Sequence, residues 1–573
     1  MNTRITKKLL AVLTAGMLIL MMASLSFAAH AAGYDEADAT RFVFTDDSVT
    51  ATDGAYTGYK IKGTALTINE AGTYVVSGSC ENGSIVIKKN VTGVTLVLEN
   101  LTLSASATAP ITCNKGSGVT IVAAAGSVNN LSDDKYNNDD VYTDETLYPD
   151  IENAVIKCKD GSNVTIAGTG TINVTAYGKN GVKGGADLYE EDEDGNATDV
   201  LLSTASLTIR DVTLNVEISH SYKDPEDPSA YDGDAIKSEK ELNILSGTVT
   251  VSANDDGIKC DYVLNIGEEG TDGPTIKVTK AAEGIEGAVV NVFSGSVYVT
   301  ATDDGINAAN GDIAERSADF SYNQYGGYVW VNVTNGDGVD SNGSASLTGG
   351  TLEVYAPSQG DGDPIDTEFG CTLGGATVLA VGHAMMQQSY AGTYVAFGGS
   401  AGRGGFGGTG TNLVTAGGAI TVADANGSVL YSGSAVRDAS YVLFASPSLT
   451  AGGTYTLNGS SSATAGTSNG NQGGFPGGQG GDQPGFPGEG GDRPGFPGGA
   501  PGEFLLGDID GDGAVTAADA RIALRISVGL EIVEVFSPSY MAADVDRSGL
   551  ITAADARLIL RAAVGLETLQ PTR

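Results

Sequence analysis

Asp255-Asp256-Gly257-Ile258-Lys259-Cys260 is one copy of a short motif that recurs along the chain and decides its fold. The residue at the centre of each copy is Ile111, Ile156, Val182, Ile236, Ile258, Ile285, Ile306, Val339 or Ile365. Most neighbouring copies lie 21 to 33 residues apart, and alternating Val, Ile and Thr residues broken by Gly, Asn and Asp fill the intervals. Such segments are typical of strands and turns. A period of this length, built from strands alone, is typical of a solenoid.

Strand alternation gives each residue of the motif a direction. The central Ile or Val points inward, the next residue outward, and the third residue inward again. The third place holds Cys113, Cys158, Gly184, Ser238, Cys260, Gly287, Ala308, Ser341 or Thr367. All are small, as a crowded interior row requires, so these cysteines are predicted to fill the core rather than to bind metal. A disulfide between Cys113 and Cys158, on neighbouring coils, remains an alternative.

The outward residues of the motif should form a continuous row on one face, because stacked coils lie about 4.8 Å apart. The row reads Thr112, Lys157, Lys183, Lys237, Lys259, Glu286, Asn307, Asp340 and Asp366. The predicted ligand-binding residues of this face are Lys157, Lys183, Lys237, Lys259 and Asn307. If the chain is instead an enzyme that works by β-elimination, Lys237 and Lys259 are the predicted bases, since neighbouring positive charge lowers a lysine pKa. Otherwise the lysines stay charged and only bind anions.

A second row lies two residues before each central Ile or Val. It reads Asn180, Asp234, Asp256, Glu283, Asp304, Asp337 and Asp363. Stacked carboxylates repel one another unless a cation neutralises them, which predicts calcium between the coils. The predicted ligands are Asp234, Asp255, Asp256, Asp303, Asp304 and Asp337. The alternative is that Asp-Gly serves only as a favourable turn dipeptide.

The repeat, together with an entry segment Ala71-Gly-Thr-Tyr-Val-Val-Ser-Gly78 and an exit segment from Tyr441 to Leu457, resembles a family of secreted, polysaccharide-lyase-like proteins. The resemblance covers residues 40–457. It implies an all-β fold, a right-handed parallel β-helix with a β-rich C-terminal cap. It also implies carbohydrate binding, with affinity for cellulose and pectic acid and with calcium in the helix.

Near the C-terminus one segment is written twice, starting at Asp508 and again at Asp544. Each copy has the spacing of an EF-hand loop, in which positions 1, 3, 5, 7, 9 and 12 supply oxygen ligands to calcium. The predicted ligands are Asp508, Asp510, Asp512, Ala514 (carbonyl), Thr516 and Asp519 in one loop, and Asp544, Asp546, Ser548, Leu550 (carbonyl), Thr552 and Asp555 in the other. The duplication predicts two bound Ca²⁺ ions.

The loops depart from the EF-hand at position 12, where Asp replaces Glu, and one helix follows each loop. With the Gly-Leu-Glu ending, residues 505–569 therefore resemble the type I dockerin family. The resemblance implies a module that folds on binding calcium and docks onto a cohesin domain of a scaffold protein. It places the cohesin contacts at Ala517, Ala518, Leu524, Arg525, Ala553, Ala554, Leu560 and Arg561. The alternative for Leu524 and Leu560 is that they form the core of the helix pair.

Acidic residues outnumber basic ones by 70 to 31, a net charge of −39 that excludes long-range attraction to nucleic acid. Residues 1–31 have the layout of a secretory signal, with an apolar run from Leu9 to Met22 and small residues at Ala28 and Ala31. No other stretch is apolar over a length that spans a bilayer. We therefore expect a secreted, extracellular protein without a membrane span.

Composition also sets the predicted domain limits. They are a signal peptide (1–31), a parallel β-helix (32–377) with a β-rich C-terminal part (378–457), a Gly/Pro-rich linker (458–504), a dockerin (505–569) and a tail (570–573). The linker repeats Gly-Phe-Pro-Gly and has too few apolar side chains to build a core.

These features predict a cellulosome component that binds plant cell-wall polysaccharide, cellulose or pectic polygalacturonate or both, and attaches to a cohesin. The alternative is a calcium-dependent pectate lyase of the same assembly. A purely structural adhesin fits the solenoid but gives the calcium module a role only if it anchors the protein to the cell. Histidine-based catalysis has little support, since only His220 and His383 follow the signal segment.

Overall fold

The structure is a computed structural model. It describes residues 38–52, 54–191, 197–223, 232–311, 313–314, 316–360, 362–383, 388–398, 412–469, 505–510, 514–527, 538–543, 545, 551–564, 566 and 569. The predicted signal peptide, most of the predicted linker and the tail lie outside these residues.

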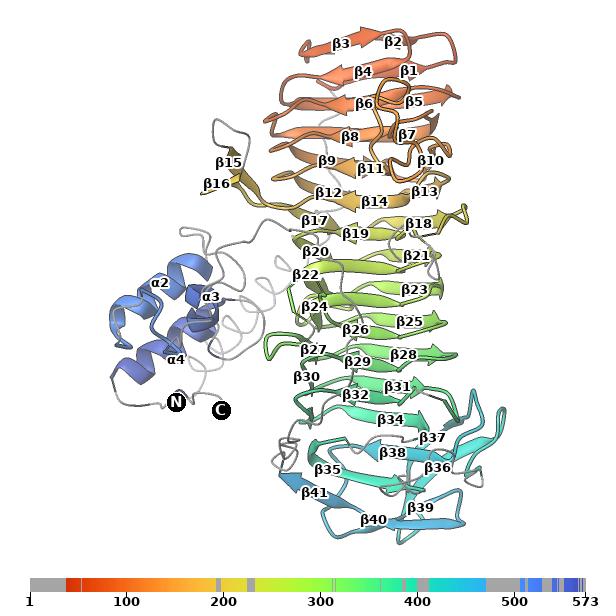
Figure 1. Cartoon of the computed structure of the whole chain (residues 1–573), viewed down its shortest axis with the longest axis vertical. Coiled ribbons are helices and arrows are strands. Elements are labelled where there is room, and N and C mark those ends of the chain that lie inside the picture. Colours follow the sequence, from red (N-terminus) through yellow and green to blue (C-terminus); the bar gives the residue numbers. More distant parts are fainter. Residues whose placement is uncertain are drawn as a thin grey trace, which may run out of the picture.

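The chain is nearly all-β, as the sequence predicted. One sheet contains 35 strands, and the helices of the described residues are α2 (Ala517–Ser527), α3 (Pro538–Ala543) and α4 (Ala553–Ala563). Figure 1 shows the large sheet as an elongated stack of short strands. None of the described helices has the length and hydropathy of a membrane-spanning segment.

The strands of the stack form three columns, and within each column neighbouring strands are parallel. The motif column contains β4 (Ala65–Ile68), β6 (Ser84–Ile87), β8 (Ile111–Cys113), β11 (Ala154–Cys158), β14 (Asn180–Gly184), β19 (Ile236–Ser238), β22 (Ile258–Ile266), β24 (Ile285–Val292), β26 (Ile306–Ala308), β29 (Val339–Ser341) and β32 (Ile365–Thr367). Each coil of chain contributes one segment to this column and one to each of the other two.

The middle column contains β5 (Gly72–Cys80), β7 (Val94–Ser104), β9 (Gly118–Ala123), β12 (Asn163–Gly168), β17 (Ser206–Ile209), β20 (Glu241–Ile244), the second halves of β22 and β24, β27 (Ser321–Gln324), β30 (Ser344–Leu347), β33 (Cys371–Leu373) and β35 (Tyr390–Phe397). The third column contains the second halves of β5 and β7, then β10 (Val128–Ser132), β13 (Thr171–Ala176), β18 (Thr213–Ile218), β21 (Thr248–Ser252), β23 (Thr275–Lys280), β25 (Ser296–Ala301), β28 (Tyr328–Val333), β31 (Thr351–Tyr355) and β34 (Thr377–Gly382).

The register of the motif column is the one that the sequence predicted. The central Ile or Val residues of neighbouring copies are direct partners from Ile111 to Ile365, and all are buried. The third residues of the motif also face the core. Cys113 and Cys158 are partners across neighbouring strands as buried free thiols, so the disulfide alternative is wrong for this structure.

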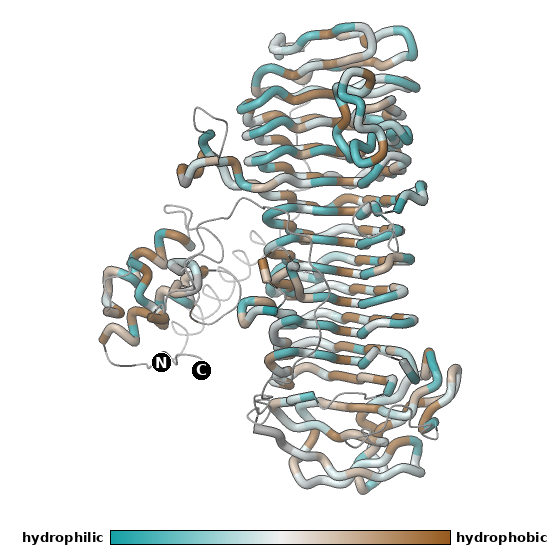
Figure 2. Tube along the Cα trace, in the orientation of Figure 1, coloured by the Kyte–Doolittle hydropathy of each residue, from teal (hydrophilic) through white to brown (hydrophobic). Residues whose placement is uncertain are grey.

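Alternation along each strand builds the core, because every second side chain of a strand points to the same face. Figure 2 shows hydrophobic and hydrophilic residues alternating along the strands of the stack. The inward Val, Ile and Leu residues form one continuous hydrophobic cluster that runs from Phe42 to Ala445. Stacking therefore buries a face that no single coil could cover by itself.

Additional strands close both ends of the stack. At the first end, β1 (Thr40–Phe44) pairs with β2 (Val49–Ala51) and β5, and β3 (Tyr59–Lys62) pairs with β4. At the other end, β38 (Tyr441–Ala445) runs antiparallel to β34 and β35. A separate sheet joins β36 (Ala419–Asp424), β37 (Val429–Ser434), β39 (Thr454–Leu457) and β40 (Ser461–Thr464). Covered ends leave fewer free strand edges for association.

The predicted linker begins too early. Residues 461–464 form β40, which pairs with β39, and β41 (Gly466–Asn469) pairs with β35. These segments are rich in Ser, Thr and Gly, so their composition resembles a tether. Their ordering comes from backbone pairing with a neighbouring strand, which composition does not report.

Two insertions interrupt the stack, one between β10 and β11 and the other between β14 and β17. In the first, Asp133, Asn137 and Asn138 are buried, and Asn137 hydrogen-bonds to the Asp133 carboxylate and to the backbone of Ala154, Glu152 and Asn153. The second carries the hairpin of β15 (Leu188–Glu191) and β16 (Ala197–Ser203). The first insertion is thus a folded segment with its own polar anchor.

Candidate functional site

The motif column presents its outward row on one face, as predicted. Lys157, Lys183, Lys237 and Lys259 are successive register partners, and the row continues through Glu286, Asn307, Asp340 and Asp366. The short strands β11, β14, β19 and β22 position these lysines, because an inward residue on each side fixes the outward direction.

Three of the four lysines of this row are paired with carboxylates. The Nζ atom of Lys183 lies 2.9 Å from Glu239, and that of Lys237 lies 3.6 Å from Asp234. Lys259 lies 2.8 Å from Asp256 and 2.6 Å from Glu286. Their side chains are 19 to 23% exposed, so a ligand on this face meets a network of ion pairs.

The pKa shifts of the lysines bear on the choice between binding and catalysis. Burial disfavours the charged form of Lys237 and Lys259, but nearby carboxylates, led by Asp234 and Asp256 respectively, outweigh it and raise the pKa of both lysines. A lysine that acts as a base needs the opposite shift. Lys157 has it, because burial and then the charge of Lys183 lower its pKa.

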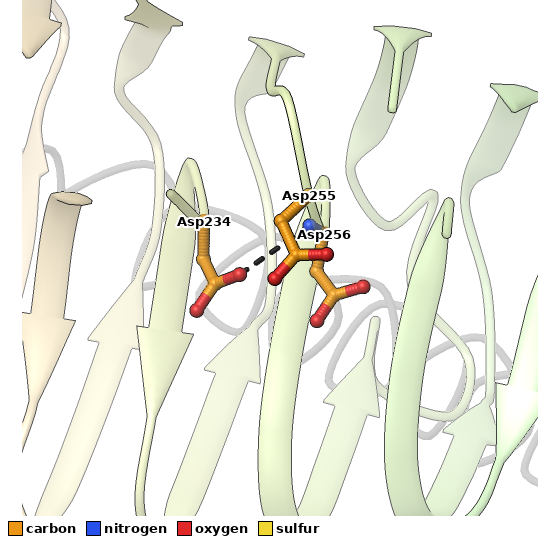
Figure 3. Close-up of side chains that lie close together, drawn as sticks. All are labelled: Asp234, Asp255 and Asp256. Atoms are coloured by element: carbon orange, nitrogen blue, oxygen red, sulfur yellow. Dashed lines mark hydrogen bonds between the residues drawn. The ribbon is translucent and has the colours of Figure 1, made fainter. Parts of the chain in front are cut away.

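Three of the predicted calcium ligands come together beside this row. One carboxylate oxygen each of Asp234, Asp255 and Asp256 lies within 4.8 Å of the others. Figure 3 shows them on two neighbouring turns, and the backbone N–H of Asp256 donates to Oδ1 of Asp234 over 3.3 Å. Asp234 is 6% and Asp256 2% exposed. Hard oxygen ligands at this spacing suit a divalent cation such as Ca²⁺.

The electrostatics of this group favour a cation between the carboxylates. Burial, followed by the charges of Asp256 and Asp234, raises the pKa of Asp255 to about 8. Burial likewise raises the pKa of Asp256 well above its usual value, although Lys259 opposes the shift. Carboxylates held this close without a cation must take up protons or repel one another.

A second carboxylate group shares Asp256 and adds Glu283 and Glu286. Here the ammonium of Lys259 already supplies positive charge to Asp256 and Glu286. Glu283 accepts a hydrogen bond from the amide of Asn307 over 2.9 Å. This group is therefore satisfied by the chain itself and is the weaker candidate for a metal.

A third group joins Asp337 to Asp340 and Asp366, two residues that the sequence placed in the outward row but not among the ligands. Burial comes first among the causes that raise the pKa of Asp337 to about 9 and of Asp340 to about 7. The buried Oδ1 atom of Asn307, the register partner of Asp340, has no hydrogen-bond partner among the described residues. The change from lysine to aspartate along the outward row is the feature of the sequence that indicates this group.

Asp303 and Asp304 were also predicted as calcium ligands, and the structure does not group them with other candidate ligands. Asp303 is exposed, and Oδ1 of Asp304 instead accepts the backbone N–H of Asp337 over 2.6 Å. Neither belongs to a group of at least three candidate ligands in the described part of the chain. Some side chains of this row accept the backbone N–H of the next coil, as Asn180 does from Asp234 and Asp304 does from Asp337.

The helical segment brings together three predicted ligands of its first loop. Oxygens of Asp508, Asp510 and Asp519 lie within 4.8 Å of one another. Asp519, fully buried, accepts hydrogen bonds from the backbone of Ile509, Asp510 and Thr516 and from the Thr516 hydroxyl, and Asp555 accepts the same pair from Thr552. Ala514 is also among the described residues, whereas Asp512, Asp544, Asp546, Ser548 and Leu550 lie outside them.

The predicted cohesin contacts lie on the surface of α2 and α4. Leu524 is 47% and Leu560 46% exposed, while Ala523 and Ile559 fill the core between the helices. The interpretation of the two leucines as core residues is therefore wrong. Arg525 and Arg561 follow them and are exposed, as are Ala517 and Ala553, and Ala518 is partly exposed; the side chain of Ala554 is not described.

Comparison with known proteins adds one family match. Residues 62–198 match a family model described as a carbohydrate-binding domain-containing protein. No curated protein matches the chain. Among solved structures, the polysaccharide lyase-like protein from C. thermocellum, a gadolinium derivative, is 20% identical, with a TM-score of 0.31, 59% coverage of this chain and 96% of that one.

Proposed function

We propose that the chain is a secreted polysaccharide-binding protein whose stacked coils form a right-handed parallel β-helix that holds calcium on its motif face. The observation that carries the proposal is the group formed by Asp234, Asp255 and Asp256 beside the lysine row, within a chain whose residues 62–198 match a carbohydrate-binding family. The proposed ligand is plant cell-wall polysaccharide, namely cellulose, polygalacturonate or both.

Calcium and the lysines have separate roles in this proposal. Ca²⁺ held by Asp234, Asp255 and Asp256 can bridge to the carboxylate or hydroxyl oxygens of a sugar, because Ca²⁺ accepts six to eight oxygen ligands. Lys183 and Lys237 lie next to each other in the outward row. They provide hydrogen-bond donors to an anionic chain that follows the row. The Asp337, Asp340 and Asp366 group is a second proposed calcium site.

Retention on polysaccharide tests the proposal. The full chain is passed over polygalacturonate gel and insoluble cellulose, with calcium or with a chelator. We expect calcium-dependent retention on the gel, and a loss of at least about tenfold in affinity for the Asp256→Asn variant, because one charged ligand is removed. Asp160→Asn, a partly exposed carboxylate outside the groups above, is the matched control. A wild-type chain that neither polysaccharide retains would sink the proposal.

A calcium-dependent pectate lyase is the alternative, and the lowered pKa of Lys157 is the observation that favours it. Such an enzyme would produce unsaturated uronides that absorb in the ultraviolet. We expect no rise in absorbance when the full chain is incubated with polygalacturonate and calcium. A steady rise that disappears in Lys157→Met but persists in Lys237→Met would establish the lyase and identify its base.

We also propose that residues 505–569 form a dockerin that binds two Ca²⁺ ions and attaches the protein to a cohesin within a cellulosome. The cluster of Asp508, Asp510 and Asp519 and the exposed Leu524 and Leu560 support it. Binding of the full chain to immobilised cohesin domains, in calcium and in chelator, is the test. Complexes that survive chelation, or that are unaffected by Leu524→Asp together with Leu560→Asp, would contradict the proposal.

A further inference from the structure

The outer face of the third column carries aromatic side chains on three neighbouring strands. They are Tyr298 on β25, Tyr328 and Trp330 on β28, and Tyr355 on β31. Tyr298 and Trp330 are direct register partners. The preceding strands of the column have Thr, Asn, Ser, Glu or Lys at their outward positions, so the aromatic residues are a local feature.

The rings contact one another along the stack. The ring centroids of Tyr298 and Tyr328 are 5.8 Å apart, and those of Trp330 and Tyr355 are 6.0 Å apart. Tyr298 is 38% exposed, and Tyr328 and Trp330 are partly exposed. We refer to Tyr298, Tyr328 and Trp330 as the aromatic strip.

Packing against the C-terminal part explains only one end of these aromatic residues. Tyr355 is buried in a second hydrophobic cluster with Val381, Phe397 and Phe444, and Trp330 packs at the margin of that cluster. Tyr298 belongs to none of the hydrophobic clusters that the described residues form. Packing in these clusters therefore does not account for the large exposed ring of Tyr298.

Polar groups continue the strip on the same face. Asn332 follows Trp330 by two residues on β28, and the Nε atom of Arg437 donates a hydrogen bond to its Oδ1 atom over 2.6 Å. Asn332 and Arg437 line a shallow pocket of about 450 Å³ together with Ser358, Ala416, Val436 and Asp438. Apolar rings that lead to a few fixed polar groups are the usual composition of a small-ligand site.

We propose that the aromatic strip and the adjoining pocket bind a neutral, extended polysaccharide chain that runs along the stack. The inference deepens the proposed polysaccharide binding, on which it rests, and places it on a second face. Aromatic rings offer flat apolar surface to the C–H faces of sugar rings, and the tyrosine hydroxyls add polar contacts. Strands about 4.8 Å apart repeat at a spacing comparable with one sugar residue of an extended chain.

Size and charge identify the occupant. The strip is roughly 10 Å along the stack, since it spans two neighbouring strands and their rings, whereas a stable protein interface buries ~800 Å² on each partner. A narrow linear ligand fits it better than a protein. Glu353 on β31 is the register partner of Trp330 and places a carboxylate at the end of the strip. Its negative charge repels the carboxylates of a uronate chain and so disfavours that ligand.

Trp330 is the only tryptophan of the chain, so its fluorescence reports on the strip directly. The full chain is titrated with cellohexaose as a neutral probe and with oligogalacturonate as an anionic one. We expect cellohexaose to shift the emission of Trp330 and oligogalacturonate to leave it unchanged. We expect Tyr298→Ala to weaken cellohexaose binding by at least about tenfold and to retain binding to polygalacturonate gel.

Two further variants complete the test. Trp330→Phe keeps an aromatic ring at the margin of the C-terminal cluster and should bind cellohexaose severalfold more weakly. Phe369→Ala removes a 56% exposed ring elsewhere on the stack and should bind like wild type. Suppose that wild type is retained on polysaccharide, that cellohexaose leaves the Trp330 emission unchanged, and that Tyr298→Ala binds cellohexaose as wild type does. The proposal for the aromatic strip is then wrong and the proposed function stands. If no polysaccharide is retained, both fail.

Discussion

At the scale of single residues, glycine precedes five of the nine central residues, and packing rather than a turn requires it. Gly257, Gly284, Gly305 and Gly338 all have ordinary backbone angles and none has a positive φ. A Cβ atom on Gly305 would lie 2.1 Å from Cγ1 of Val331 and 2.5 Å from the carbonyl oxygen of Gly338. The glycines allow the motif column to approach the third column and the next coil.

We therefore expect Gly305→Ala to destabilise the stack. The new methyl group meets both a side chain and a backbone oxygen, and overpacking of this kind costs about 3 kcal/mol of unfolding free energy. Gly311→Ala is the matched control, because no atom of the described residues lies within 4 Å of the place that its new Cβ would take and its φ is not positive; its cost should stay within about 0.5 kcal/mol. Urea denaturation of the full chain measures both. Equal midpoints for the two variants would rule out the packing explanation.

The sequence predicted the direction of each motif residue but not the partners of its charges. Alternation sufficed for Ile258 and Cys260, because inward and outward follow from the period of a strand. The pairing of Lys259 with Asp256 and Glu286 depends on the stacking of two coils and on rotamers, which no local pattern reports. For this reason the sequence predicted the lysine row but not the ion pairs that Lys183, Lys237 and Lys259 form.

At the scale of the strand, asparagine side chains hydrogen-bond from coil to coil and hold the register. Asn243, Asn265, Asn291 and Asn323 are successive partners in the middle column, with amide-to-carbonyl distances of 2.9 to 3.0 Å. Asn291 is fully buried. Because each amide donates to one neighbour and accepts from the other, loss of one member leaves two buried groups unpaired.

Asn291→Ala should therefore lower the unfolding free energy by about 3 kcal/mol. Asn173 offers a matched control: it makes the same two bonds, to Asn130 and from Asn215, in a ladder that is partly exposed. There water can replace the lost partners, so Asn173→Ala should cost about 1 kcal/mol or less. Thermal unfolding of the two variants checks the difference. A larger loss for Asn173→Ala would show that the ladders do not stabilise by buried hydrogen bonding.

The strand-level prediction was accurate where the period was regular and failed where it was not. The nine copies of the motif have the register that their spacing implied. The strands from Ser461 to Asn469 were missed because their small polar residues carry no alternation. The aromatic residues of the strip can be read in the sequence, but their exposure cannot. It depends on where the C-terminal part stops covering the third column.

At the scale of the whole molecule, some of the chain's acidic residues form buried or partly buried groups on the motif face of the stack. Burial is the largest cause that raises the pKa of Asp255, Glu283 and Asp337, to about 8, 8 and 9 respectively. The helical segment behaves differently, because hydrogen bonds from Thr516 and Ile509 overcome the effect of burial and lower the pKa of Asp519. The acidic residues behind the net charge of −39 therefore include two classes of carboxyl group. One class has a raised pKa and the other a lowered pKa, so their effects on stability change with pH in opposite directions.

The sign of the pH dependence follows for the calcium-free stack. A carboxyl group whose folded pKa exceeds its unfolded value contributes stability below the unfolded pKa, near 4, and this contribution is lost as the pH rises through the folded pKa. Between pH 5 and pH 9 the ionised groups near Asp256 and Asp340 repel one another without a counter-ion. Calcium can replace the lost protons, and a ligand that binds only the folded state stabilises it.

We therefore expect two linked effects in calorimetry of the full chain. In chelator, the midpoint of the β transition should be several degrees lower at pH 9 than at pH 5. Added calcium should raise that midpoint strongly at pH 9 and only slightly at pH 5, where protons compete for the same oxygens. Asp255→Asn combined with Asp337→Asn should flatten both dependences, because each change removes a carboxylate that titrates in this range. A calcium effect of equal size at pH 5 and pH 9 would show that these carboxylate groups do not bind the metal.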